Sequence, residues 1–153
     1  MPLYVIDYVL STPNGDLDRR SGETGQVREL VWIALGGAAG AVSRYLVTLG
    51  CQRWTTTSFP LATLIVNLTG CFLLGVLAQF GMQSEWLRPT LRLAIGVGLL
   101  GGLTTFSTFG HETFRAIEKG QWTLALGNAA ANLIIGILAV WAGVALVQRW
   151  GNV

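Results

Sequence analysis

Charged residues, histidine and cysteine are all scarce in this sequence. Of its 153 residues 12% are charged, about half the share of an ordinary soluble domain, and the net charge is +2. So weak a positive charge does not indicate nucleic-acid binding. One histidine and two cysteines leave few ligands for a zinc site, and no pair of nucleophile and base stands out. An enzyme is therefore the least favoured class of protein.

Hydrophobic side chains, by contrast, make up 52% of the residues. They gather in four segments that approach or exceed the roughly 20 residues needed to cross a bilayer. The segments cover about residues 30–49, 60–81, 91–117 and 122–147, with short connections between them. The sequence thus predicts an all-α, multi-pass membrane protein with four transmembrane helices and both termini on one side.

The first 28 residues differ from the rest. They carry turn residues and mixed charge, and their apolar start has no positive charge and is interrupted by Asp7. This pattern argues against a signal peptide. We interpret residues 1–28 as a disordered N-terminal extension and residues 29–153 as the four-helix transmembrane domain. Association of the extension with the membrane surface is the less favoured alternative.

The third apolar segment contains an unusual stretch, GGLTTFSTF, at residues 101–109. Each glycine lowers helix propensity by about 1 kcal/mol, and the hydroxyl groups offer the backbone alternative hydrogen bonds. We expect the third helix to be broken near Gly101–Thr105. Non-helical backbone at membrane depth must be buried in protein or line a wet cavity. Freed carbonyl groups at such a break are natural ligands for a cation.

Polar side chains recur at helical spacing inside the apolar segments. Thr63 and Asn67 lie four apart in the second segment, and Asn128 and Asn132 lie four apart in the fourth. An amide in a bilayer needs a partner, so these asparagines form either helix–helix hydrogen bonds or part of a pore wall. Arg44, in the first segment, either snorkels to the interface or faces a vestibule that attracts anions.

Pairs of glycines four residues apart allow helices to approach closely. They occur at Gly36 and Gly40 and again at Gly98 and Gly102. Because four short helices enclose little space, we expect the chain to form oligomers, with these glycine-rich faces between the copies.

Basic residues are divided almost evenly between the two ends of the helices. Without the N-terminal extension, four lie on the side of the termini and three on the other: Arg28, Arg88, Arg92 and Arg149 against Arg53, Arg115 and Lys119. Such a weak bias hardly fixes the orientation of the chain. We therefore expect insertion in both orientations.

Three blocks of the sequence resemble the Fluc (CrcB) family of fluoride channels. They are GGAAGAVSRY at 36–45, TLIVNL at 63–68, and residues 101–109 with Glu112, in the order of that family. The resemblance covers about residues 30–150. It implies a fluoride-specific channel of the cell inner membrane that exports fluoride passively and lowers its cytoplasmic concentration. It also implies an antiparallel, dual-topology homodimer with two pores.

The resemblance further implies roles for individual residues. The backbone carbonyl groups of Gly101 and Thr104 from both subunits would hold a structural sodium ion. The residues along the fluoride pores would be Asn67, Phe106, Ser107, Thr108 and Phe109. Those of the vestibule or polar track would be Arg44, Thr63, Glu112, Asn128 and Asn132. The roles of Asn128 and Asn132 stay open, because relatives vary at these positions.

Two other functions are compatible with four membrane spans. A small dual-topology multidrug transporter needs a membrane-embedded carboxylate for proton exchange, but the first segment holds Arg44 and has Glu29 only at its edge. A non-transporting assembly protein would not need a broken third helix with polar stripes on three helices. The fluoride channel is the favoured hypothesis.

Overall fold

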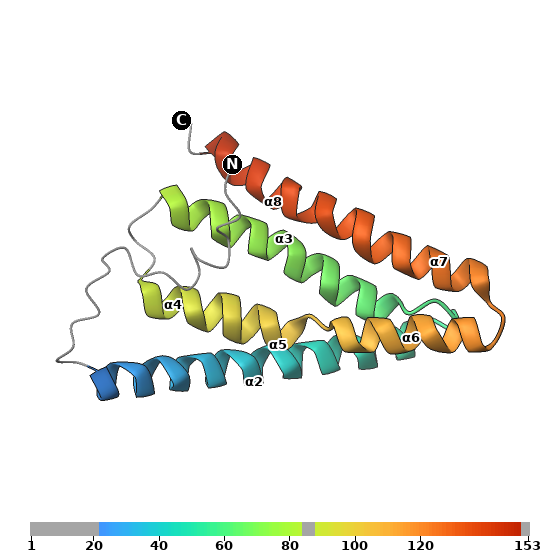
Figure 1. Ribbon diagram of the computed structural model, residues 1–153, viewed down its shortest axis with the longest axis horizontal. Helices are drawn as coiled ribbons and strands as arrows, with labels where there is room; N and C mark the ends of the chain where they lie inside the picture. Colours follow the sequence, from blue (N-terminus) through green and yellow to red (C-terminus); the bar gives the residue numbers. More distant parts are fainter. Residues whose placement is uncertain (1–21, 84–87, 151–153) are drawn as a thin grey trace.

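The computed structural model describes residues 22–83 and 88–150, and within them the chain crosses a helical bundle four times (Figure 1). Helix α2 (Gly22–Trp54) makes the first crossing and α3 (Leu61–Gln83) the second. The third crossing contains α4 (Pro89–Leu93), the π-helical η1 (Ala94–Leu100), α5 (Gly101–Leu103) and α6 (Phe106–Glu118). The fourth contains α7 (Trp122–Ala130), the π-helical η2 (Ala131–Ile135) and α8 (Gly136–Trp150). All four crossings are long and apolar enough to span a membrane, which confirms the predicted four-helix membrane protein.

Helix α2 is longer than the apolar segment from which it was predicted. Its 33 residues extend beyond both ends of the expected span, 30–49. A helix of this length measures about 50 Å, whereas the hydrocarbon layer is about 30 Å thick. Both ends of α2 therefore reach the headgroup region, where hydropathy no longer marks a helix. The boundary expected at residue 28 falls inside α2, and residues 1–21 lie outside the described part.

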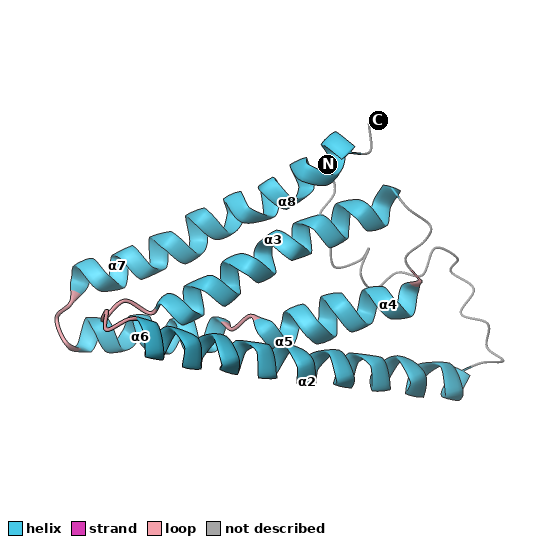
Figure 2. Cartoon of the chain, turned by 180° about the vertical axis from the view of Figure 1, so that it is seen from behind, coloured by secondary structure: helices cyan, strands magenta, loops and turns pink. Residues whose placement is uncertain are grey.

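Successive crossings run in opposite directions, and each packs against a neighbouring crossing. Helix α2 lies along η1 and α5, α3 packs against α8, and α6 packs against α7 (Figures 1 and 2). Helices α2 and α8 lie at opposite edges of the bundle. This arrangement leaves most of the first crossing open on the surface of the single chain, including Leu35, Val42 and Leu46.

Glycines allow the closest of these contacts. A Cβ atom added to Gly98 would lie 2.7 Å from the carbonyl oxygen of Ile33, and one added to Gly102 would lie 3.1 Å from the Cα atom of Gly37. Cβ atoms on Gly36 and Gly40 would likewise collide with the backbone of η1 and α5. Our expectation that these glycine faces lie between copies is therefore wrong, because they bring α2 against the third crossing within one chain.

A small apolar core lies between α3 and the third crossing. It consists of Val66, Leu77, Leu100 and Leu103, all of which are buried. Leu100 and Leu103 stand directly before the interruption of the third crossing. The core therefore fixes the end of α5 against α3 and positions the site described next.

Candidate functional site

The third crossing is interrupted at two residues, Thr104 and Thr105. Thr104 has φ −82° and ψ 157°, and Thr105 has φ −153° and ψ 112°, both extended conformations. Gly101, with φ −63° and ψ −38°, is helical. The predicted break is confirmed, but it is confined to the threonines, and the adjacent glycines do not adopt an unusual backbone.

The break redirects two backbone hydrogen bonds. In a continuous helix the Thr105 N–H would donate to the carbonyl of Gly101 and the Thr108 N–H to that of Thr104. Here the Thr105 N–H donates to Asn67 Oδ1 at 2.8 Å, and the Thr108 N–H donates to Thr105 Oγ1 at 3.2 Å. Thr105 is thus the N-cap of α6. The carbonyl groups of residues 101–104 thereby lack helical partners, and they include those of Gly101 and Thr104, which the family resemblance nominates for a cation.

Arg44 of α2 contacts this break directly. Its Nη1 atom donates a hydrogen bond to the carbonyl oxygen of Thr104 at 3.2 Å, and the side chain is half-buried. The guanidinium group therefore points toward the middle of the third crossing and not toward a helix end. It supplies a positive charge to a carbonyl group that has no helical partner.

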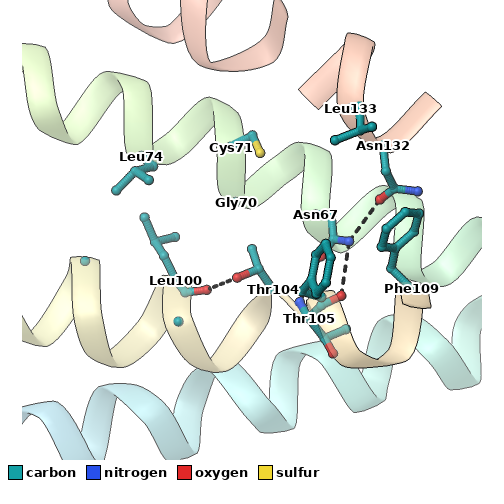
Figure 3. A pocket seen from close by; sticks show the side chains of 13 residues that line it. Asn67, Gly70, Cys71, Leu74, Leu100, Thr104, Thr105, Phe109, Asn132 and Leu133 are labelled. Carbon is teal, nitrogen blue, oxygen red and sulfur yellow. Dashed lines mark hydrogen bonds between the residues drawn. The ribbon is translucent and has the colours of Figure 1, made fainter. Parts of the chain in front are cut away.

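A cavity of about 350 Å³ opens beside the break, between α3, the third crossing and η2 (Figure 3). It brings together six residues nominated from the sequence, namely Asn67, Gly101, Thr104, Phe106, Phe109 and Asn132. The rings of Phe106 and Phe109 are 5.5 Å apart, centroid to centroid, at an interplanar angle of 57°. Phe109 is buried, whereas Phe106 is 80% exposed and contributes most of its surface to the outside of the single chain.

A chain of amide hydrogen bonds runs from the cavity across the bundle. Asn67 Nδ2 donates to the Thr105 carbonyl at 3.3 Å and to Asn132 Oδ1 at 2.9 Å, as Figure 3 shows. Asn132 Nδ2 donates to Asn128 Oδ1 at 3.0 Å, and Asn128 Nδ2 donates to Thr113 Oγ1 at 2.8 Å. The asparagines thus form interhelical hydrogen bonds, and two of them, Asn67 and Asn132, also line the cavity.

A second cavity, of about 330 Å³, lies on the other side of the break. Its polar lining includes Arg44, Thr63, Thr105 and Thr108. Thr63 Oγ1 donates to Glu112 Oε1 at 2.9 Å, while the buried Glu112 Oε2 has no hydrogen-bond partner among the described residues. The structure therefore brings Arg44, Thr63 and Thr108 to one cavity and ties Glu112 to its wall.

Ser107 stands apart from both cavities. Its side chain is exposed, and its Oγ atom lies 3.2 Å from Thr105 Oγ1. It thus contacts the break through another hydroxyl group.

Thr105 and Thr113 are two polar residues of the site that were not among the residues nominated from the sequence. Thr105 lines both cavities and bonds to Asn67 through its N–H and its carbonyl group. A threonine directly before a helical segment is a recognised N-cap signal, so Thr105 was within reach of sequence reasoning. Thr113 has no such signal, because only the packing of α6 against α7 brings it to Asn128.

Comparison with known proteins assigns the chain to a family. The model of the family described as "CrcB-like protein, Camphor Resistance (CrcB)" matches residues 31–144. This chain belongs to the CrcB family. The match of the family extends from early in α2 to within α8 and so includes the break and both cavities.

Individual relatives in the CrcB family agree over nearly their whole length. A protein of Sorangium cellulosum is 43% identical over 118 residues, which are 77% of this chain and 93% of the relative. One of Citrifermentans bemidjiense is 43% identical over 122 residues, or 80% and 98% of the two chains. One of Shewanella woodyi is 44% identical over 121 residues, or 79% and 97%. Each of these relatives is named "Fluoride-specific ion channel FluC".

Proposed function

We propose that this chain is a fluoride-specific ion channel, a multi-pass protein of the cell membrane that lets fluoride leave the cytoplasm passively. The observation that carries the proposal is the cavity at the break, where an amide, hydroxyl groups and two phenylalanine rings meet at membrane depth. The names of its CrcB relatives support the same ion. Conduction requires no covalent chemistry, which agrees with the expectation from composition that an enzyme is the least favoured class of protein.

The donors around the break suit a small anion. Fluoride holds its hydration water strongly, so a pore must replace that water with hydrogen-bond donors and positive ring edges. Asn67 has two N–H groups, and both donate to protein oxygens in this structure. A fluoride ion would accept a hydrogen bond from one of them by replacing the Thr105 carbonyl or Asn132 Oδ1 as the acceptor. Phe106 and Phe109 add ring edges. The further hydroxyl donors that the resemblance nominates lie beside this cavity, Thr108 in the wall of the second cavity and Ser107 outside both.

The residues at the break also fit a structural sodium ion. A hard cation prefers oxygen ligands, and the carbonyl groups of Gly101 and Thr104 are among the four, at residues 101–104, that lack helical partners. Gly101 is exposed on the surface of the single chain, so a second copy could add matching oxygens. When bound, the ion would compensate the partial negative charge of these carbonyl groups. Arg44 orients the Thr104 carbonyl by donating to it.

An antiparallel homodimer in which the two copies insert with opposite topology is part of this proposal. One chain leaves Phe106 80% exposed and Leu133 58% exposed, although both line the cavity. A partner copy would cover that face and complete the wall of the path. The near-even distribution of basic residues supports opposite orientations for the two copies.

The decisive experiment is ion efflux from liposomes that contain the purified full-length protein. We expect rapid loss of fluoride and no comparable loss of chloride through the same preparation. Size-exclusion chromatography on the same sample checks that the protein is folded and dimeric. A folded dimer without fluoride flux would contradict the function, whereas a conducting monomer would contradict only the assembly.

A further inference from the structure

A third cavity, of about 390 Å³, lies at the end of the bundle where the first and third crossings begin. It is lined by Arg28 and Trp32 of α2 and by Arg88, Thr90 and Leu91 at the start of the third crossing. Helices α2 and α4 pack against each other here. The cavity therefore combines two cationic side chains, a hydroxyl group, an indole ring and an aliphatic side chain.

The tryptophans place this cavity at the depth of the lipid headgroups. Trp32 and Trp54 are both exposed and stand 22 residues apart on α2, a rise of about 33 Å. The fourth crossing has exposed tryptophans at 122, 141 and 150, and the first two are separated by roughly 28 Å. Both separations match a hydrocarbon layer of about 30 Å, and tryptophan favours its two boundaries. Arg28 lies one turn beyond Trp32 and hence among the headgroups.

The described residues do not neutralise the two arginines. Neither guanidinium group of Arg28 and Arg88 forms a salt bridge or hydrogen bond with any residue in the described ranges, and both side chains are exposed. Glu29, the nearest acid in sequence to Arg28, is not part of the lining. Two guanidinium groups that no described residue pairs, beside a cavity, present a site for a phosphate group, which arginine recognises with two parallel donors.

We propose that this cavity binds the headgroup of an anionic phospholipid, with Arg28 and Arg88 on its phosphate and Trp32 and Leu91 against its glycerol and upper acyl chain. Thr90 contributes a further hydroxyl donor. A free phosphate ion is also negatively charged but has no apolar part. The indole and leucine side chains of the cavity would then have no apolar group to contact. The proposal does not depend on fluoride conduction.

The test is native mass spectrometry of the purified full-length protein, released from neutral detergent micelles and titrated with phosphatidylglycerol or phosphatidylcholine. The variants are Arg28→Gln and Arg88→Gln. Arg149→Gln is the matched control, because Arg149 is an exposed arginine at the same end of the bundle and outside the cavity. One arginine near the membrane surface contributes on the order of a fivefold change in affinity for an anionic lipid.

We expect each cavity variant to bind the first phosphatidylglycerol about fivefold more weakly, with phosphatidylcholine binding unchanged in all proteins. Arg149→Gln should bind both lipids like the unaltered protein. Equal weakening in Arg149→Gln would overturn the site in favour of diffuse surface charge. Displacement of phosphatidylglycerol by millimolar inorganic phosphate would overturn the lipid as occupant and leave a free phosphate ion. Unchanged melting temperature and fluoride flux exclude misfolding as the cause.

Discussion

The third and fourth crossings share several features, yet their backbones differ. Each has a π-helical stretch followed by a glycine, η1 before Gly101 and η2 before Gly136, and both glycines have helical dihedral angles. Each also carries polar side chains at membrane depth. Yet the third crossing breaks at Thr104 and Thr105, while the fourth continues as helix from residue 122 to residue 150.

The difference lies in the partners that neighbouring helices provide. Asn67 of α3 bonds to both the N–H and the carbonyl group of Thr105, and Arg44 of α2 donates to the carbonyl of Thr104. In the fourth crossing, Asn132 Nδ2 turns back to the carbonyl of Asn128 on its own helix. A break in the membrane therefore forms where other helices satisfy the freed backbone groups. Gly102, beside the break, serves close packing against Gly37 of α2 instead.

Of the substitutions that test this difference between the crossings, removal of the Asn67 side chain should have the largest effect on stability and flux. Asn67→Leu deletes three hydrogen bonds, two of them to the backbone of Thr105. Each buried group left without a partner costs about 1–3 kcal/mol, so we expect a loss of at least about 3 kcal/mol in folding free energy, together with loss of fluoride flux. Thermal unfolding in detergent measures the first and liposome efflux the second.

Thr69→Val is the control for Asn67→Leu, because Thr69 lies on the same helix with an exposed side chain. It should retain the stability and the flux of the unaltered protein. A stable, conducting Asn67→Leu protein would show that the break does not depend on the hydrogen bonds from Asn67 of α3.

Phe109→Ile should separate the pore from the packing. Phe109 is buried, lines the cavity and has its ring tilted against that of Phe106. Loss of the ring removes a positive edge from the path, and we expect fluoride flux to fall by about tenfold, which corresponds to about 1.4 kcal/mol. A volume-reducing aliphatic swap costs a few kcal/mol at most, so the dimer should still assemble.

Phe114→Ile makes the same chemical change on the same helix at an exposed position outside both cavities. Its flux should equal that of the unaltered protein. If both variants conduct normally, Phe109 is a packing residue and the proposed path lies elsewhere.

The capping threonine should have a smaller effect. Thr105→Val removes the hydroxyl group that accepts the Thr108 N–H and donates to Thr108 Oγ1. Loss of an N-cap costs about 1 kcal/mol, and a looser break should reduce the flux severalfold. Thr105→Ser keeps the hydroxyl group and should behave like the unaltered protein in the same unfolding and efflux assays. Equal losses in both variants would assign the effect to the missing methyl group and not to the cap.

The sequence allowed the crossings to be predicted because each needs about 20 apolar residues, and hydropathy reports that length directly. It also located the break, from the glycines and the hydroxyl groups, but it did not identify Asn67 and Arg44 as the partners of the freed backbone groups. Local propensity cannot show which distant helix supplies a hydrogen bond. For the same reason, spacing alone left Asn128 and Asn132 between two interpretations, and only the contact with Thr113 connects them to α6.

Gly101, the first glycine of the pair beside the break, provides the smallest expected effect. Gly101 is helical, and a Cβ atom added to it meets nothing within 4 Å in the chain. Gly101→Ala should therefore change the free energy of unfolding of the single chain by no more than about 1 kcal/mol, in the stabilising direction. Gly102→Ala is the contrast, because its Cβ atom would lie 3.1 Å from the Cα atom of Gly37 and force α2 away, at a cost of about 1–3 kcal/mol.

Thermal unfolding and dimer retention on size-exclusion chromatography, measured on both variants, distinguish the two glycines. If Gly101→Ala unfolds as easily as Gly102→Ala, the break does require a glycine backbone at residue 101, and the argument from neighbouring helices fails at that residue. If Gly101→Ala keeps its chain stability but loses the dimer, the added methyl group acts on the second copy. That outcome would place Gly101 at the contact between subunits, where its carbonyl group is proposed to share a sodium ion.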